Sequence, residues 1–311
     1  MGKYLITTGQ NLYDVAMHLY GSIEGIIDLL INNPNLSMDD KLIVGDELMY
    51  TDDYTINEDI VAYNTAHTIL PASGERNVYY KHPSFPKIVE IQLDNKKTSA
   101  SFAYIGVGEI EIDWGDNTPL EKLFLKNESA STLHYFDNKI SSKRRIRIYA
   151  HDVKFKELNF SSLHASSILC SRPLSVEKFI LSQTKINISS LSLLKDVYYM
   201  DLTGLETSDL SPLLKQKQLM LLDLQKIAVS QTVLDSFLIS IVQHYHERRN
   251  CNVLLTMKPS GNYQEPAKDD NNKYVLTSGM EAIWVITHEE AWNEGGYWQF
   301  QINDTIYTTE P

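Results

Sequence analysis

The sequence predicts a mixed α+β chain that is built from several small domains. Its 311 residues exceed the usual length of one domain. Its hydrophobic spacing changes from mixed strand and helix signals to a two-residue alternation, and then to apolar segments that recur every 21 or 22 positions. We therefore expect a β-α-α-β module, a small antiparallel β-sandwich, a repeat solenoid and a C-terminal β meander.

Residues 1–51 contain two strand signals around two helix signals. Residues 4–7 form a short β-favouring run, and Asn11 stands where a helix N-cap belongs. Gly21 ends this first helix, Ser22 can cap the next one, and residues 41–50 return as a strand with an internal turn. The second helix is expected to bury one apolar face, made of Ile23, Ile26, Ile27, Leu30 and Ile31.

This opening segment resembles the LysM family in the order and spacing of its residues. The resemblance covers about a sixth of the chain, and it implies two helices stacked on one side of a two-stranded sheet. LysM modules generally bind glycans that contain N-acetylglucosamine, such as peptidoglycan. The matching residues are Tyr4, Gly9, Leu12, Ala16, Tyr20, Gly21, Asn33, Pro34, Leu42, Gly45 and Leu48.

The resemblance also implies a glycan-binding groove between two loops. Asn and Gln amides suit uncharged sugar amides and hydroxyls. After Gly9 the family usually has Asp and then Ser or Thr, whereas this chain has Gln10 and Asn11. LysM-like modules also occur in phage tail and baseplate proteins, where they can serve assembly, so glycan contact and scaffolding both stay open. The implied groove residues are Gly9, Gln10, Asn11, Leu12, Asn33, Pro34, Asn35 and Leu36.

Residues 52–85 are expected to form a linker with one short element near residues 60–63, and residues 86–152 a β domain. In that domain residues 102–105 and 109–114 are separate strands. The string from Ile112 to Thr118 resembles the signature of PKD-type β-sandwich repeats, which are non-catalytic. Asp113 and Asp116 could be paired catalytic carboxylates or calcium ligands. We favour the alternative that Asp116 and Asn117 cap a tight turn.

Residues 153–257 carry four apolar segments that end at Phe160, Leu181, Leu202 and Leu224, which are 21, 21 and 22 positions apart. A fixed period in this range indicates a solenoid. The spacing resembles leucine-rich repeats, although the expected Asn ladder is missing. Such repeats leave an extended face, which either binds a protein partner or is part of a plain spacer. A helix over residues 231–249 and a strand over 253–255 complete the segment.

Residues 258–311 are expected to form a loop and then a β meander. The predicted strands are residues 282–287, 297–302 and 305–308. Three of the four tryptophans lie here, at Trp284, Trp292 and Trp298. They can supply the core of the meander, which we favour, or a platform for sugar rings.

Composition limits the possible functions. A formal net charge of -12 argues against nucleic acid as a partner, and no segment is apolar and long enough to span a membrane. We expect the two cysteines to be reduced and buried, and we find no signal peptide, metal-binding spacing, cofactor motif or catalytic motif. The expected function is non-catalytic binding or adhesion at a bacterial cell envelope, and the alternative is a structural part of a phage tail or baseplate.

Overall fold

The computed structural model describes residues 1–311 except 39, 73–80, 117, 137–143, 245–247 and 310–311. The described residues form a mixed α+β structure with one large β-sheet and few helices. The chain divides into two compact units, Met1–Tyr79 (unit 1) and Tyr80–Pro311 (unit 2), each with its own hydrophobic core. Each unit is described by itself.

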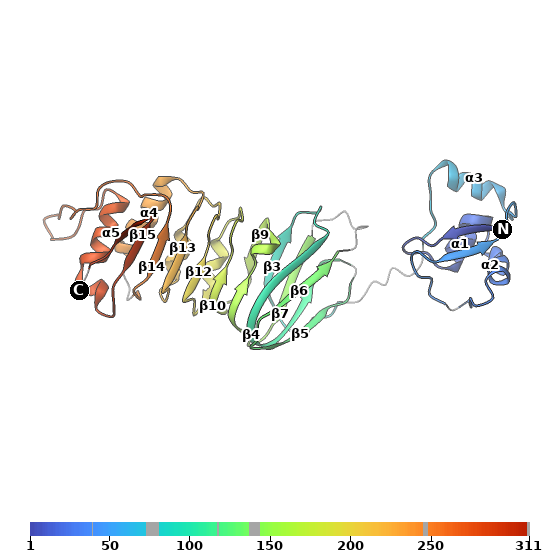
Figure 1. The fold of residues 1–311 in the computed structure, drawn as a ribbon, viewed down its shortest axis with the longest axis horizontal. Helices are drawn as coiled ribbons and strands as arrows, with labels where there is room; N and C mark the ends of the chain where they lie inside the picture. Colours follow the sequence, from blue (N-terminus) through green and yellow to red (C-terminus); the bar gives the residue numbers. More distant parts are fainter. Residues whose placement is uncertain (39, 73–80, 117, 137–143, 245–247, 310–311) are drawn as a thin grey trace. The chain divides into compact units, whose positions relative to one another are not determined.

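Unit 1 has two helices between two antiparallel strands (Figure 1). Strand β1 (Gly2–Leu5) pairs with β2 (Glu47–Tyr50), and β2 is shorter than the strand predicted over residues 41–50. Between them lie α1 (Leu12–Tyr20), the 3-10 helix η1 (Ile23–Gly25) and α2 (Ile26–Asn32). The core side chains are Ile6, Leu12, Val15, Ala16, Tyr20, Ile26, Leu29 and Leu48.

A third helix, α3 (Glu58–Ala66), lies in the segment that the sequence assigned to the linker. The backbone N–H groups of Ile56 and Asn57 both donate to the carbonyl of Tyr20, at 3.0 and 2.9 Å. This contact satisfies a carbonyl at the end of α1 that no helical bond can reach. Part of the segment from residue 52 to 85 therefore belongs to unit 1.

The second helix buries only part of the predicted face, since Ile26 is buried and Leu30 packs against the core. Ile26 and Leu29 are buried, but Ile23, Ile27 and Ile31 are 54%, 65% and 71% exposed. The helix is short and only one side of it contacts the core, so the column at positions i, i+4 and i+8 faces away. One column of this helix contains the exposed Ile23, Ile27 and Ile31, and the opposite side contains the buried Ile26 and Leu29. Apolar spacing alone could not choose between them, because both are made of Ile or Leu.

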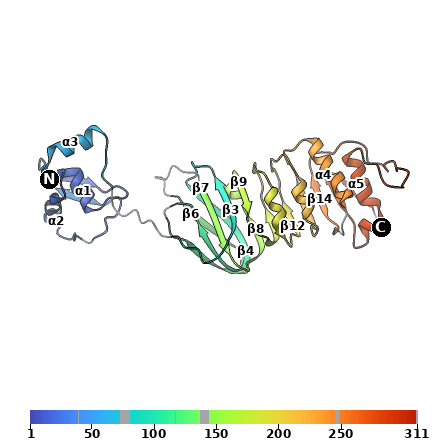
Figure 2. The same cartoon turned by 180° about the vertical axis from the view of Figure 1, so that it is seen from behind.

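The first part of unit 2 is antiparallel. Strand β4 pairs in succession with β5 and β6, and also with β7 and β8, while β3 lies between β7 and β9 (Figures 1 and 2). The two strands predicted over residues 102–114 are one strand, because the chain passes Gly106 with only a register shift. The elements are β3 (Lys87–Leu93), β4 (Ser99–Asp113), β5 (Glu121–Lys126), β6 (Ala130–Tyr135), β7 (Arg144–Ala150), β8 (Lys154–Asn159) and β9 (Ser167–Cys170).

The second part of unit 2 is a row of short parallel strands that continues the same sheet. In order they are β8, β10 (Leu174–Ile180), β12 (Tyr199–Asp201), β13 (Leu221–Leu224), β14 (Asn252–Leu255) and β15 (Gln299–Ile302). Two flanking strands, β11 (Leu194–Lys195) and the antiparallel β16 (Thr305–Tyr307), pair with β10 and β15. The four apolar segments predicted from the 21- and 22-residue period overlap β8, β10, β12 and β13.

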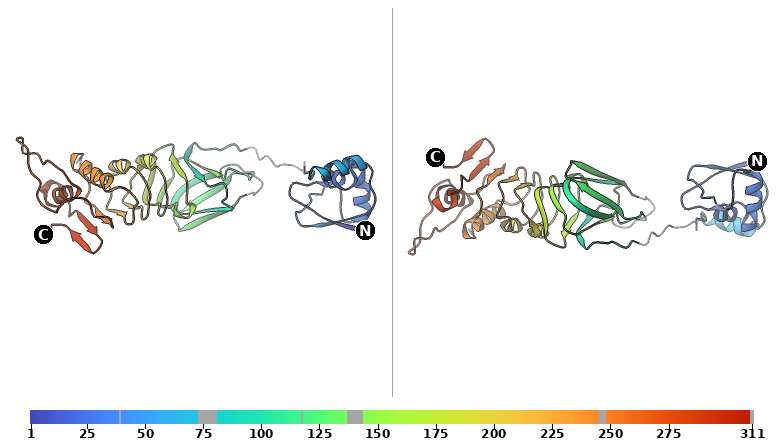
Figure 3. Two further views of the ribbon diagram at one scale, coloured as in Figure 1. Left: turned by 90° about the horizontal axis from the view of Figure 1, so that it is seen from above. Right: turned by 90° about the horizontal axis from the view of Figure 1, so that it is seen from below.

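Helical turns cover one side of these parallel strands (Figure 3). The 3-10 helices are η2 (Ser161–Leu163), η3 (Ser189–Leu193) and η4 (Ser211–Lys215), and α4 (Gln231–Gln243) follows them. Each 3-10 helix begins with a serine whose N–H donates to an Asn or Asp two positions earlier. The acceptors are Asn159 at 3.0 Å, Asn187 at 2.7 Å and Asp209 at 2.8 Å. This side-chain turn starts the return segment of each repeat.

Two predictions for the C-terminal part were wrong. Helix α4 ends at Gln243 with His244 as its C-cap, although the sequence predicted a helix to residue 249; residues 245–247 lie outside the described part. Residues 282–287, predicted as a strand, lie in α5 (Gly279–His288), which α6 (Glu290–Asn293) follows. Helix α5 is buried on nearly all sides, and a short apolar run of this kind does not separate strand from helix.

Among the helices of the described ranges, none combines the length and apolar character that a membrane crossing requires.

Candidate functional site

An open groove lies in unit 1 beside the loop that follows α2. Its volume is about 580 Å³, which falls in the range of roughly 300–1,000 Å³ that is typical of small-ligand sites. Its walls are mostly polar. The lining residues are Asn32, Asn33, Pro34, Asn35, Leu36, Asp40, Lys41, Leu42, Asp46, Glu47 and Leu48.

Asn33 connects the end of α2 to strand β2. Its Nδ2 donates to the carbonyls of Leu29 and Met49, both at 2.8 Å, and its Oδ1 accepts from the N–H of Met49 at 3.0 Å. The side chain thus continues the hydrogen bonding of β2 at the edge of the two-stranded sheet. All three polar partners are internal, so the Asn33 amide has a structural role although the residue lines the groove.

The next residues offer polar groups to the groove. Pro34 and Asn35 are exposed, and no hydrogen bond within the described part of unit 1 engages the Asn35 side chain. Leu36 is half-buried and packs against the core. The Asn35 amide can donate and accept at once, which matches the acetamido group of an amino sugar.

Acidic side chains surround much of this groove. The Asp40 carboxylate accepts from the N–H of Ser37 at 2.7 Å, and the Glu47 carboxylate pairs with the Lys3 ammonium at 2.8 Å. Asp46 and Lys41 also line it. Sequence reasoning did not include residues 40–42 and 46–48 in the groove. It predicted a strand with an internal turn over residues 41–50, whereas the strand begins only at Glu47.

The other half of the predicted site has a different role. Gln10 is buried: its amide donates to the Tyr4 hydroxyl at 2.8 Å and to the Pro71 carbonyl at 3.1 Å, and accepts from the N–H of Thr7 at 2.9 Å. Asn11 caps α1 in a reciprocal pair with Asp14. These amides maintain the turn and the helix start.

Leu12 belongs to the core of unit 1, and Gly9 occupies the exposed turn with a φ of +81°. The structure therefore gathers residues 33–36 at one groove together with residues 40–48. It does not place residues 9–12 among the lining of that groove.

In unit 2 the Asp113–Asp116 segment forms a capped turn. The Asp113 carboxylate accepts from the N–H of Gly115 at 2.9 Å, and Asp116 accepts from the N–H of Thr118 at 3.1 Å. Asp116 therefore has the turn-capping role that we favoured for it, whereas Asn117 lies outside the described residues. Gly115 adopts a φ of +77°, a conformation that L side chains rarely adopt.

Both carboxylates of this turn are also paired with cations or donors. Asp113 contacts the Lys81 ammonium at 2.5 Å and the Arg147 guanidinium at 2.8 Å, and Asp116 contacts Nε2 of His134 at 2.6 Å. Burial by itself would raise the pKa of each carboxyl, but these contacts outweigh it and hold both pKa values below the usual value. Paired in this way, the two acids stabilise the fold.

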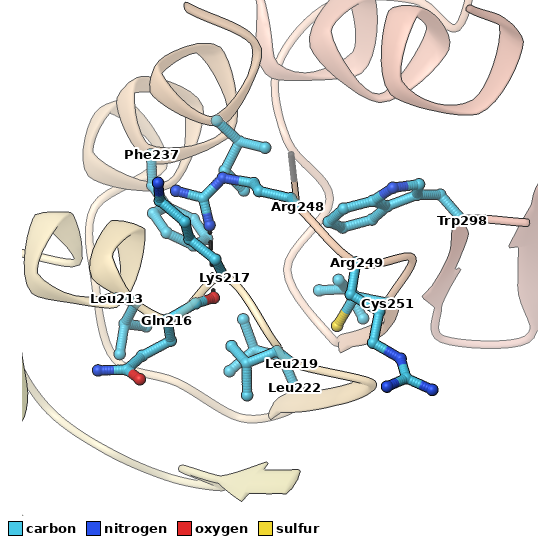
Figure 4. Close-up of a pocket in the computed structure, with 12 residues that line it drawn as sticks. Leu213, Gln216, Lys217, Leu219, Leu222, Phe237, Arg248, Arg249, Cys251 and Trp298 are labelled. Atoms are coloured by element: carbon cyan, nitrogen blue, oxygen red, sulfur yellow. Dashed lines mark hydrogen bonds between the residues drawn. The ribbon is translucent and has the colours of Figure 1, made fainter. Parts of the chain in front are cut away.

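A small cavity lies where η4, α4 and β14 meet (Figure 4). Its volume of about 20 Å³ admits roughly one water molecule, so it is too small for an organic ligand. Arg248 borders it and donates to the carbonyls of Leu214 and Gln216, the latter at 3.4 Å. The guanidinium thus satisfies carbonyls at the end of η4, and burial lowers its pKa.

The two cysteines are buried and free, as predicted. Burial raises the pKa of Cys170 to about 11 and that of Cys251 to about 12. Both thiols therefore stay protonated near neutral pH, and a protonated thiol is a poor nucleophile.

Trp292 and Trp298 are 6% and 4% exposed, which supports the core role that we favoured for these two tryptophans over a sugar platform.

The strands of unit 2 present a row of side chains in register. Lys178 of β10 lies between Glu157 and Tyr199, and its ammonium pairs with the Glu157 carboxylate at 3.0 Å. Tyr199 is 42% exposed and is in register with Leu221. The row therefore places charged, aromatic and aliphatic groups side by side on neighbouring strands.

Within the described ranges, no group of three or more His, Cys, Asp or Glu side chains is placed to hold a metal ion. Comparison of the chain with family models, with curated proteins and with solved structures finds no match.

Proposed function

We propose that this chain is a non-catalytic, modular binding protein that contacts the bacterial cell envelope. Unit 1 is a LysM-like module whose groove binds a glycan containing N-acetylglucosamine, such as peptidoglycan. Unit 2 joins PKD-like strands to a leucine-rich-repeat-like solenoid, and the row that includes Lys178 and Tyr199 contacts a protein partner. Two modest contacts in one chain strengthen each other because the first raises the effective concentration of the second.

The observation that carries this proposal is the polar groove beside residues 33–36. Asn35, whose amide has no hydrogen-bond partner in the described part of unit 1, lines this groove together with Asn33, Pro34 and Leu36. Glycan recognition needs donors and acceptors held in place, and Asn33 holds this loop by bonding α2 to β2.

The test is a calorimetric titration of the full chain with a hexamer of N-acetylglucosamine. We expect binding by the unaltered chain and a large loss of affinity in Asn35→Ala. The matched control is Asn95→Ala, an exposed asparagine in unit 2 that should bind as well as the unaltered chain. Absence of binding by the unaltered chain, or equal binding by the two variants, contradicts glycan recognition at this groove.

A second candidate is a structural role in a phage tail or baseplate, with unit 1 used for assembly. The observation that favours it is that the amides of Gln10, Asn11 and Asn33 all have internal partners, while Asp40, Asp46 and Glu47 line the groove. An acidic wall disfavours anionic envelope polymers. If the chain binds neither the hexamer nor insoluble peptidoglycan, that result favours this candidate. It then also favours a location in the virion over one in the cell envelope.

A further inference from the structure

Unit 1 exposes far more apolar surface than its share of the chain. It carries fourteen of the twenty-three large apolar side chains that are exposed among the described residues, although it spans only a quarter of the sequence. It also contains twelve Asp and Glu against three Lys and Arg, so its formal charge of -9 accounts for most of the chain's -12. Exposed apolar side chains that lie next to one another mark interaction sites, whereas singly scattered ones do not.

Three of these side chains form an ordered column. Ile23, Ile27 and Ile31 lie at positions i, i+4 and i+8 of the continuous helical segment η1–α2, so they point to the same side. They are 54%, 65% and 71% exposed. With a rise of about 1.5 Å per residue, the column extends over roughly 12 Å, or more than two helical turns. We call it the isoleucine stripe.

Acidic side chains border this stripe. Glu24 and Asp28 each follow a stripe residue by one position, which places them about 100° around the helix, in a parallel column. Asp28 is fixed there, because its carboxylate accepts from the Tyr20 hydroxyl at 2.7 Å and from the Thr51 hydroxyl at 2.6 Å. The helix that carries the stripe is therefore rigidly attached to the unit.

We propose that the isoleucine stripe docks an amphipathic helix of a protein partner, whose own apolar face is flanked by lysine and arginine. Two helices with matching apolar ridges can pack along such a stripe, and the basic flanks complement the charge of unit 1. A second copy of this chain fits poorly, since two copies of unit 1, each with a formal charge of -9, would repel each other. Anionic lipid meets the same repulsion, and a sugar would find no hydrogen-bonding side chain on the stripe.

This contact goes beyond the proposed function, because it uses a face of η1 and α2 and not the groove residues that would hold a glycan. The two can succeed or fail separately: Asn35→Ala addresses the groove alone, and substitutions of the stripe leave Asn35 in place. A chain that binds the glycan and not the helix, or the reverse, identifies which idea has failed.

The probe is a fluorescently labelled helical peptide of leucine and lysine, titrated with the full chain and followed by anisotropy. The test variant is Ile27→Gln with Ile31→Gln, which removes apolar surface, keeps the charge and introduces a good helix former. The matched control is Leu133→Gln with Tyr135→Gln on β6 of unit 2, because these side chains are also exposed, at 60% and 71%. Circular dichroism verifies that both variants fold.

We expect the stripe variant to bind the peptide at least tenfold more weakly and the control to change by less than about twofold, because each isoleucine buries an apolar side chain in the contact. Equal binding by the stripe variant means that charge alone attracts the peptide, and overturns the proposal. So does equal binding of a leucine–glutamate peptide. If the unaltered chain forms a dimer that the stripe variant does not form, the face binds a second copy instead. If it binds vesicles and the stripe variant does not, the face binds lipid instead.

Discussion

Asn33→Ala tests whether one predicted glycan ligand is instead part of the framework of unit 1. The change removes three hydrogen bonds, two to Met49 and one to Leu29. Each contributes about 1 kcal/mol net. Because Asn33 and Met49 are only half-buried, water replaces part of this loss, and we expect the free energy of unfolding of unit 1 to fall by about 2 kcal/mol.

That loss is large for a unit of this size. A folded segment of some 70 residues has roughly 4–10 kcal/mol of stability, and in such a domain each kcal/mol shifts the melting temperature by about 4–8 °C. We therefore expect the transition of unit 1 to move down by about 10 °C in differential scanning calorimetry of the full chain. Hydrogen exchange of peptides within residues 1–72 assigns the transition, since all four tryptophans lie in unit 2.

The matched control is two positions away. Asn35→Ala removes an exposed side chain with no internal partner, so its effect on stability should stay within about 0.5 kcal/mol. If unit 1 has the same melting temperature in the two alanine variants, the bonds between α2 and β2 do not stabilise it, and the reasoning about Asn33 is wrong.

Three further predictions concern unit 2. Gly115→Ala should destabilise it by more than about 2 kcal/mol, because a Cβ there would approach the Arg145 carbonyl to 2.2 Å at a positive φ; an unchanged urea midpoint, followed by tryptophan fluorescence, contradicts this. Asp113 and Asp116 have lowered pKa values when folded, so the stability they contribute is complete above about pH 4 and is lost as the pH falls through their folded pKa values. Asp116→Asn should flatten the dependence of the urea midpoint on pH below about pH 4, and an equally steep fall in that variant argues against the pairing. Cys170 and Cys251 should resist a thiol reagent at about pH 8 until urea unfolds the chain, and rapid labelling of the native chain refutes their burial.

Much of the local structure could be predicted from the sequence. Asn11 and Ser22 cap α1 and η1, as their positions before apolar runs predicted. The period of 21 or 22 residues predicted strands that the structure pairs in parallel, with Met200 aligned to Leu222. These signals depend on nearby residues, so one sequence contains them in full.

The candidate site was less predictable. Asn33 and Asn35 were both predicted as groove residues, yet one is bonded to α2 and β2 and the other is exposed, because only folding brings Met49 beside Asn33. Gln10 is similar, since its partner Pro71 is 61 positions away in the chain. Helix α5 was mistaken for a strand, although Ser278 followed by Glu281 was a helix-start signal within the sequence.

The sequence by itself determined where turns, caps and repeats occur, because these follow from the conformational preferences of each residue and its near neighbours. Only the tertiary structure decided which of two apolar columns of the second helix is buried and which amides keep a free side chain. Those outcomes depend on contacts between distant segments, and Ile26 and Ile27 differ in nothing but the direction that folding gives them.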